Sequence, residues 1–401
     1  MVTARIIWYR ITYPVIALVL RPIAYFFLNY RYERVKPKHK PYLYFSNHTT
    51  YWDYILVGVA SRRQMFYVAG EHLFRNKLLY RVVLCLCGLI IRKKGAPAGD
   101  MILEMKQRLT EGGNVWMSPE GTRSLNGESA FISPNTGKLV KECAEIGAGL
   151  ITYRIHGGYL RRPRWSTVIR KGRMWGEFVH EYSPEELKAM SLEEINRHIN
   201  EDMYVNTFAD QKEKHYVYKG HDLASGLETV LYVCPKCHAI GTLHSHDDKL
   251  TCECGYSVKF NEHGLFEQDG TDAMIYDNVR DWDHSQRDYL KEQLPVFMQY
   301  PADKPVCMDT EQVLGKIGAL KSVENLGTGT FGIYTDRLEF NGEKGVFSFP
   351  FADIIGFAFS MQMKLLFTMK DGTYYEVESK HLRSAVKYMV LYRYLIGKEY
   401  Y

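Results

Sequence analysis

The chain has 401 residues, of which 46% are hydrophobic and 24% are charged, and its formal net charge is +5. This length predicts about two to four domains, and the hydrophobic content excludes general disorder because it is ample for packed cores. The mild positive charge would suit nucleic acid or an anionic lipid surface. No recognition motif or basic patch interleaved with aromatic residues accompanies it, so we expect no nucleic-acid partner.

Residues 6–29 are the most apolar stretch, but two arginines and two prolines interrupt them. The longest uncharged run, residues 11–20, is half of what a membrane-spanning helix needs, and no small-residue cleavage site of a signal peptide follows it. We therefore expect residues 1–30 to form a kinked helix or helical hairpin in one leaflet, with Trp8, Tyr9 and Tyr13 at headgroup depth. A buried core helix and a full membrane span are the alternatives. The interrupting residues are Arg10, Pro14, Arg21 and Pro22.

A cluster of basic residues follows this apolar stretch directly, between residues 31 and 40. Such clusters favour anionic lipid headgroups and mark the cytoplasmic side of a membrane. We expect a membrane-associated, monotopic protein on the cytoplasmic face, with membrane lipid as a partner. The cluster consists of Arg31, Arg34, Lys36, Lys38, His39 and Lys40.

Short apolar runs then alternate with helical patterns as far as residue 153, which favours an α/β layer with its site at strand-to-helix loops. Ser183 followed by a proline is typical of an N-cap, and it predicts a helix over residues 185–202. Strands are expected at 43–45, 65–69, 114–117 and 150–153, and helices at 51–61, 73–86, 100–111 and 138–146.

His48 and Asp53 follow the first of these strands. A neutral imidazole can accept a proton from a hydroxyl near neutral pH, and a carboxylate on its other nitrogen fixes the tautomer and stabilises the imidazolium. Positions i and i+5 of a regular helix lie roughly 140° apart, so the two side chains can meet only if His48 lies in a loop and the helix begins at residue 49 or 50. Residues 50–53 also fit a capping box, in which Asp53 bonds back to the helix terminus.

A second polar block, residues 118–124, follows the strand expected at 114–117 and reads Ser-Pro-Glu-Gly-Thr-Arg-Ser. It offers a carboxylate, a flexible glycine, a hydroxyl and a guanidinium. Arginine is suited to gripping phosphate through two parallel hydrogen bonds. By itself the block is equally compatible with an ordinary turn and a solvated Arg123.

Together, in this order and at this separation, the two blocks resemble the glycerolipid acyltransferases typified by lysophosphatidate acyltransferase, over roughly residues 30–215. The resemblance implies transfer of a fatty acyl group from a coenzyme A or acyl-carrier-protein thioester to lysophosphatidate, giving phosphatidate in phospholipid biosynthesis. It implies that His48 is the general base and Asp53 its orienter. The implied acceptor-phosphate site consists of Glu120, Gly121, Thr122 and Arg123.

The chain departs from the family pattern at three places. Polar Ser118 stands where an apolar residue is usual, and the fourth family block appears only as residues 151–154. In the intermediate block, spacing from Gly88 puts Lys94 at the family's arginine, whereas residue identity points to Arg92. Either cation could hold the acceptor phosphate, although lysine and arginine are not equivalent there. Another lysophospholipid or polar-lipid hydroxyl is therefore an alternative acceptor.

A catalytically silent membrane adaptor is an alternative of a different class. A scaffold would have no physical need of the histidine, aspartate, glutamate and arginine together, which argues against it. No cysteine or serine stands beside His48 as an obvious nucleophile, so direct transfer is preferred over a covalent acyl-enzyme.

Two close cysteine pairs lie near turn residues within residues 228–262, and this region resembles a zinc ribbon. Such pairs deliver four thiolates tetrahedrally to zinc, and four thiolates leave no open position for a catalytic water, so we expect the zinc to be structural. Two disulfides are the alternative, but an acyl-thioester enzyme works in a reducing compartment. His238, His244 or His246 could replace one thiolate. The expected ligands are Cys234, Cys237, Cys252 and Cys254.

The remainder of the chain is expected to hold a charged connecting helix at 277–294, within a linker at 263–304, and a strand-rich domain at 305–401. An amphipathic helix over 382–396 ends this domain, which resembles a small pleckstrin-homology or GRAM-type barrel. It would bind lipids or peptides, or pack against the rest of the chain. Its strands are expected at 331–340, 346–349, 354–359, 364–369 and 374–378.

Overall fold

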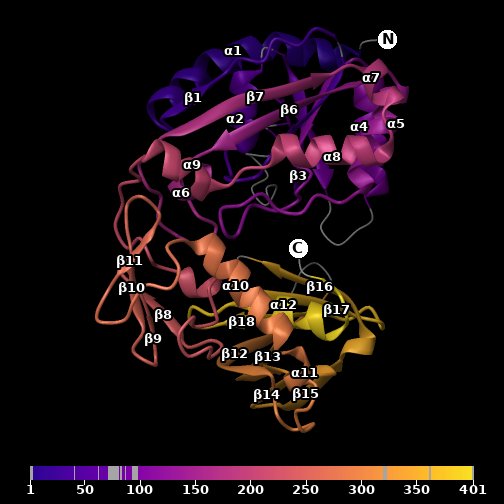
Figure 1. Cartoon of the computed structure of the whole chain (residues 1–401). Coiled ribbons are helices and arrows are strands. Elements are labelled where there is room, and N and C mark those ends of the chain that lie inside the picture. Colours follow the sequence, from indigo (N-terminus) through magenta and orange to yellow (C-terminus); the bar gives the residue numbers. More distant parts are fainter. Residues whose placement is uncertain are drawn as a thin grey trace. The chain divides into compact units, whose positions relative to one another are not determined.

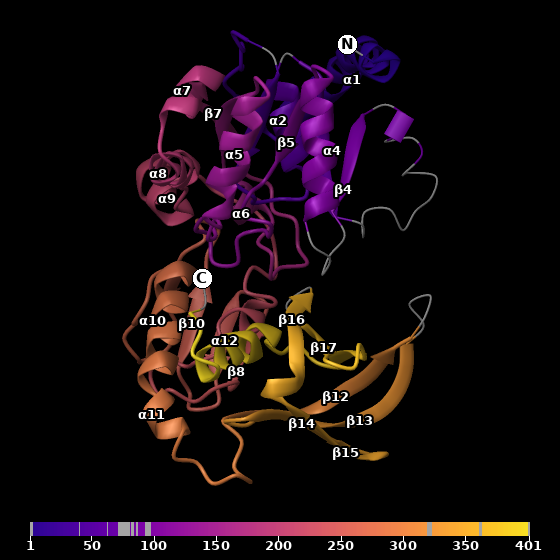
Figure 2. The same cartoon turned by 90° about the vertical axis from the view of Figure 1, so that its right-hand side faces the viewer.

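The structure is a computed structural model that describes residues 3–39, 41–61, 63–70, 81, 84–85, 87–92, 98–318, 323–360 and 363–399. It divides into two compact units (Figures 1 and 2). The N-terminal unit comprises residues 1–163 and 171–218, and the C-terminal unit comprises residues 164–170 and 219–401. The helix expected at 73–86 falls almost entirely outside the described residues.

A seven-stranded sheet forms the centre of the N-terminal unit, in the order β1-β7-β6-β2-β5-β3-β4. From β6 to β4 all neighbours run parallel, whereas β7 is antiparallel to β6 and parallel to β1. Parallel neighbours need crossover connections, and these connections place helices on the sheet faces. The strands are β1 (Tyr30–Tyr32), β2 (Tyr42–Ser46), β3 (Met65–Gly70), β4 (Gly88–Arg92), β5 (Asn114–Met117), β6 (Gly149–His156) and β7 (Met174–Tyr182).

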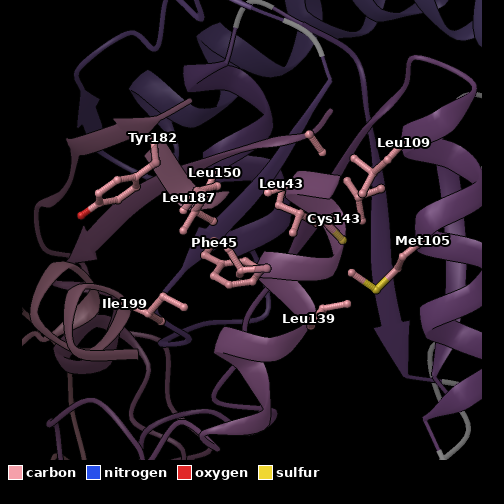
Figure 3. Packing of buried hydrophobic residues seen from close by; sticks show 14 of the residues in the cluster. Leu43, Phe45, Met105, Leu109, Leu139, Cys143, Leu150, Tyr182, Leu187 and Ile199 are labelled. Atoms are coloured by element: carbon pink, nitrogen blue, oxygen red, sulfur yellow. The ribbon is translucent and has the colours of Figure 1, made fainter. Parts of the chain in front are cut away.

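Strand β2 is buried on both faces, and its side chains divide between two cores. Leu43 and Phe45 pack with residues of the helices on one face, as Figure 3 shows, while Tyr42 and Tyr44 belong to the opposite core. This division follows from the two-residue period of a strand. The helices are α1 (Ala4–Phe26), α2 (Asp53–Ala60), α4 (Gly99–Thr110), α5 (Asn135–Glu145), α6 (Gly158–Arg161), α7 (Pro184–Ala189), α8 (Leu192–Met203) and α9 (Thr207–Lys214). The α/β layer expected from the sequence is confirmed.

Helix α1 continues through both of its prolines, so the expected hairpin is not formed. A proline removes one helical hydrogen bond, but packing against the unit supports the helix across the gaps. The Tyr13 hydroxyl donates to the carbonyls of Gly58 and Ser61, and the Arg21 guanidinium donates to the Val59 carbonyl at 3.4 Å.

One face of α1 is buried and the other is apolar and exposed. Tyr9, expected at headgroup depth, is instead buried, with its ring centroid 5.5 Å from that of Phe66. Among the described residues, α1 is the helix that is long and apolar enough to cross a membrane. Its exposed large apolar side chains are Ile7, Trp8, Ile11, Val15, Leu18, Val19, Ile23, Tyr25 and Phe26.

The single helix expected over 185–202 is two helices, α7 and α8. Ser183 caps α7 as expected, with proline at the first helical position. Ser191 caps α8 through a second reciprocal capping box with Glu194, and a cap residue is non-helical. The Ser-x-x-Glu pattern that begins at residue 191 therefore indicates a helix start, which we missed because we expected one continuous helix over 185–202.

The C-terminal unit begins with a four-stranded antiparallel sheet, in the order β11-β10-β9-β8, and the helix α10 (Val279–Glu292). This helix lies within the range expected for the connecting helix, but its inner face is part of a packed interior. The Trp282 indole donates to the Val233 carbonyl at 2.9 Å, and the Gln286 side chain pairs with the backbone of Val230 and Tyr232. The strands are β8 (Leu243–His246), β9 (Lys249–Cys252), β10 (Ser257–Phe260) and β11 (Phe266–Gln268).

A second, antiparallel sheet follows, in the order β15-β14-β13-β12-β18-β17-β16. Its edges, β15 and β16, are not paired with each other in the described residues, so the sheet is an open half-barrel, and the likeness to a pleckstrin-homology or GRAM-type barrel stays a prediction. The strand expected at 331–340 is two strands, because the chain turns between Ile333 and Arg337. The strands are β12 (Cys307–Ile317), β13 (Val323–Ile333), β14 (Arg337–Gly342), β15 (Gly345–Pro350), β16 (Ile354–Ser360), β17 (Lys364–Met369) and β18 (Tyr374–Ser379).

Helix α12 (Ala385–Leu395) is buried on nearly all sides rather than along one stripe. Its charged residue Lys387 is 1% exposed and makes an ion pair with Asp309, 2.7 Å from nitrogen to oxygen. The Tyr388 hydroxyl donates to the same carboxylate at 2.9 Å. The amphipathic pattern predicted the helix but underestimated its burial, because a buried charge with a partner looks like a surface charge in the sequence.

Candidate active site and candidate metal centre

The two polar blocks lie at the same edge of the sheet. The first follows β2 and the second follows β5, and these two strands are parallel neighbours, paired from Leu43–Val115 to Phe45–Met117. The carboxyl ends of parallel neighbours meet at one edge, where α/β proteins commonly place their sites. The topology therefore brings together residues that are far apart in the sequence.

His48 and Asp53 are in contact. The Nδ1 of His48 lies 2.7 Å from the Oδ2 of Asp53. An ionised carboxylate only accepts hydrogen bonds, so beside it a neutral imidazole donates from Nδ1 and keeps the lone pair of Nε2. The His48 side chain is 27% exposed and that of Asp53 is fully buried. The imidazole is therefore partly accessible, whereas its carboxylate partner is shielded from solvent.

Asp53 also organises the loop that carries the histidine. Its carboxylate accepts hydrogen bonds from the amides of Thr49, at 2.7 Å, and Thr50, at 2.9 Å, and from the Thr50 hydroxyl, at 2.7 Å. Asp53 is the first residue of α2, where a negative charge is stabilised by the helix dipole. The sequence suggested that Asp53 either orients His48 or caps the helix. Both roles are compatible, because one carboxylate accepts bonds from the amides at the helix start and also contacts the imidazole.

Glu120 holds the backbone of the same loop. Its two carboxylate oxygens accept hydrogen bonds from the amides of His48, at 2.9 Å, and Ala130, at 2.7 Å. Burial raises the pKa of Glu120 to about 8, with a further increase from the charge of Asp53, although the two amide bonds lower it. Glu120 was expected at the acceptor phosphate. These two bonds hold the backbone of the His48 loop, and a role of Glu120 at the acceptor phosphate stays a prediction.

The remainder of the second block turns sharply and presents Arg123. Gly121 has a φ of +66° with open space around its Cα, so glycine is favoured there by backbone conformation rather than by crowding. Thr122 is partly buried beside it. The guanidinium carbon of Arg123 lies 3.7 Å from the ring centroid of Tyr51, in the first block. The two blocks therefore meet through side chains as well as through the backbone.

The cation of the intermediate block is less well placed. Arg92 ends β4, and β5 and β3 separate β4 from β2. Three strand spacings amount to about 14 Å, so Arg92 would need its full side-chain length to approach a substrate at His48. Lys94, the alternative cation, lies outside the described residues.

Two residues that we did not predict position the His48 loop. The side chain of Asn47 is buried and pairs with the backbone of Ile155 in both directions, at 2.7 and 2.8 Å, which ties the loop to β6. Gly158 follows β6, and a Cβ there would lie 2.3 Å from the Oγ1 of Thr49. The identity of Asn47 is visible in the sequence, but its partner is not, because the two segments meet only in the folded sheet.

The four predicted metal ligands lie together in the C-terminal unit. The sulfur atoms of Cys234 and Cys254 are 3.8 Å apart and those of Cys237 and Cys252 are 3.7 Å apart, and all four lie within 4.8 Å of one another. Four sulfur atoms at about 2.3 Å from a tetrahedral zinc ion would be about 3.8 Å apart. A disulfide needs about 2.05 Å. The spacing therefore fits a thiolate metal site and not two disulfides.

Two tight turns present these cysteines. His238 has a φ of +58° and its amide donates to the Cys234 carbonyl, and Gly255 has a φ of +89° and its amide donates to the Cys252 carbonyl. The nearby imidazoles have other contacts. His238 stacks on Tyr289 and His244 contacts the carboxylate of Glu253. The four-cysteine set is therefore favoured over a set containing histidine.

Comparisons with known proteins bear on the N-terminal unit. Residues 28–156 match the family model described as Acyltransferase. No curated protein matches the chain. Among solved structures, the 1-acyl-sn-glycerophosphate (LPA) acyltransferase PlsC from Thermotoga maritima matches with 17% identity and a TM-score of 0.40, over 50% of this chain and 79% of that chain. The family match covers both polar blocks and supports an acyltransferase domain in residues 28–156.

Proposed function

We propose that this chain is an acyltransferase that moves a fatty acyl group from a thioester to a lipid hydroxyl. The contact of 2.7 Å between His48 and Asp53 is the observation that carries this proposal. It lies within the segment that matches the acyltransferase family, and Glu120 fixes the backbone on which the imidazole is mounted. An orienting carboxylate with no solvent exposure is what a general base needs and what a surface histidine lacks.

In the proposed reaction, His48 Nε2 removes the proton from the acceptor hydroxyl while its oxygen attacks the thioester carbonyl. The new carbon–oxygen bond forms, the carbon–sulfur bond breaks, and the proton passes from the imidazolium to the departing thiolate. Asp53 supports the transient imidazolium. No covalent intermediate on the protein is needed.

Lysophosphatidate is the proposed acceptor and phosphatidate the product, with acyl-CoA or acyl carrier protein as the donor. The cation Arg123 beside the His48 loop supports an anionic acceptor. The exposed apolar face of α1 supports monotopic attachment to the cytoplasmic face of a membrane, because the opposite face packs along the unit itself. A helix held in this way would place the His48 loop near the leaflet that supplies the lipid.

We also propose that the four cysteines of the C-terminal unit bind one structural zinc ion. Their sulfur spacing supports tetrahedral thiolate coordination, and the bound ion would hold the two turns together. The ion would supply no chemistry to the acyl transfer, because four thiolates would complete its coordination.

Purified protein, a labelled acyl-CoA or acyl carrier protein, and a panel of lysophospholipids and uncharged lipid alcohols would test the proposed reaction. The expected result is labelled phosphatidate, formed fastest from lysophosphatidate. Preference for another lysophospholipid would move the proposal to that acceptor. Absence of transfer from both donors to every acceptor, in folded and membrane-bound protein, would contradict it.

A further inference from the structure

Arg162 stands beside the His48 loop although it belongs to neither polar block. It follows the short helix α6, and its amide donates to the Gly158 carbonyl at 3.1 Å. Gly158 lets this helix approach the loop, because any larger residue would clash with Thr49 and Thr50. The close approach therefore delivers the Arg162 side chain to the loop that carries the proposed base.

Two guanidinium groups gather at one aromatic ring there. The guanidinium carbon of Arg123 lies 3.7 Å from the ring centroid of Tyr51, and that of Arg162 lies 5.0 Å from the same centroid. Tyr51 is two residues before Asp53. Attraction to the face of one ring holds the two cations in fixed places.

The positive charge of Arg162 acts on Arg123. Burial lowers the pKa of Arg123, and the neighbouring charge of Arg162 lowers it further, whereas Tyr51 and Asp53 raise it. Like charges brought together in a partly buried place repel each other unless an anion lies between or beside them. A phosphate monoester, which carries about 1.5 to 2 negative charges near neutral pH, would relieve this repulsion.

The adjacent Arg161 contacts the backbone rather than the ring of Tyr51. The guanidinium of Arg161 donates to the backbone carbonyls of Phe27, Leu28 and Gly172. It therefore ties the end of α6 to the segment that follows α1. Arg161 anchors the backbone while Arg162 remains at the ring of Tyr51, so the two consecutive arginines cannot be treated as one basic patch.

We propose that Arg162 and Arg123, held on the ring of Tyr51, form a two-arginine subsite that binds the phosphate of the acceptor lipid and sets the preference for a phosphorylated acceptor. This inference rests on the proposed acyltransferase function and adds a specificity-determining residue, Arg162, from outside both sequence blocks. The acyl donor also carries phosphate groups when it is coenzyme A, so the test must separate the two sources.

Initial-rate kinetics of Arg162→Ala, Arg162→Lys and Arg123→Ala would provide that test, with lysophosphatidate and the uncharged 1-acylglycerol as acceptors. Loss of one charge-assisted contact is expected to raise the KM for lysophosphatidate about tenfold or more in each alanine variant. Arg162→Lys should recover part of the loss, because lysine keeps the charge but not the paired geometry. The rise in the KM for lysophosphatidate should exceed any change in the KM for the donor or in the rate with 1-acylglycerol.

Arg197→Ala is the matched control, because Arg197 lies in the same unit, on α8, and is 57% exposed beside Glu201. Titration calorimetry with sn-glycerol 3-phosphate gives a readout independent of turnover, and affinity should fall in the Arg162 variant but not in the control. A rise confined to the donor KM would overturn the inference, as would an equal loss with both acceptors. Failure of the wild-type protein to transfer to any acceptor would instead contradict the proposed function.

Discussion

The His48 site and the four-cysteine cluster are both built from turns, but they are assembled in different ways. The cysteines lie between residues 234 and 254 and are presented by two local turns. The histidine loop is held by Glu120, Ser124 and Ile155, which reach it through neighbouring strands of a sheet buried on both faces. Losing the proposed zinc ion should therefore unfold a local structure, whereas replacing the histidine should leave the fold intact and remove the proposed chemistry.

Removal of the metal is expected to have the largest effect. Structural zinc contributes about 10–16 kcal/mol of apparent binding free energy in small thiolate sites, so Cys237→Ser with Cys252→Ser should abolish zinc binding. Hydrogen exchange should then show loss of protection over about residues 230–262, with transfer to a short-chain acceptor retained. Metal analysis should give about one zinc per wild-type chain.

The control for this experiment is Cys85→Ser, since Cys85 is exposed in the N-terminal unit. Its metal content should equal that of the wild type. A wild-type protein purified under reducing conditions that is free of zinc, yet fully protected over the cysteine region, would contradict the metal assignment.

His48→Ala tests the other half of the comparison. Loss of a positioned base costs about 10²–10⁴-fold in rate, and the thermal unfolding midpoint should change little because the side chain is partly exposed. Asp53→Asn should lower the rate as well, and it should also destabilise the loop, because its carboxylate accepts two backbone amides. His198→Ala, on α8, is the control for a partly exposed histidine in the same unit. Wild-type turnover in folded His48→Ala protein would rule out the proposed mechanism.

The apolar face of α1 offers a third, smaller test. Leu18 is 75% exposed, and burying one leucine stabilises by about 1.5–3 kcal/mol, so Leu18→Ser should weaken binding to anionic vesicles about tenfold or more. Leu103→Ser is a matched control, because Leu103 is 68% exposed on α4 of the same unit. Vesicle sedimentation measures both. Equal losses for the two variants would show that α1 is not the attachment surface.

The pH dependence of stability tests the buried support under His48. The unfolded chain releases the Glu120 proton near its ordinary pKa of 4.5, whereas the folded protein retains it until about pH 8. The folded state therefore holds more protons between these values, and the contribution of Glu120 to stability falls as pH rises. In the Glu120→Gln variant, the free energy of unfolding should no longer show this part of its decrease with rising pH.

The same substitution should also cost about 1–3 kcal/mol, because a glutamine side chain has one acceptor oxygen for two backbone amides. Thermal unfolding of the wild type and the variant at pH values between 4.5 and about 8 provides the measurement. Identical slopes in the wild type and the variant would show that Glu120 does not titrate in this way.

Features carried by short spacings could be predicted from the sequence. A histidine that precedes a helix can reach an aspartate at its start, as His48 and Asp53 do. Two cysteine pairs beside turns predict the four-cysteine cluster. The strands of the α/β layer follow from short apolar runs, as β2 and β5 show. Element ends were predicted less well, since the break between α7 and α8 depends on a serine cap within a continuous apolar period.

Tertiary structure alone decided how these pieces meet. The sequence does not show that the Glu120 carboxylate accepts hydrogen bonds from the amides of His48 and Ala130, because these residues meet only in the folded chain. The prolines of α1 predict a break, but contacts with α2 hold the helix together across them. Arg162 joins the site because Gly158 permits a close approach. Spacing along a chain determines which neighbours can touch, whereas contacts between distant segments depend on the sheet order and packing that only the folded protein has.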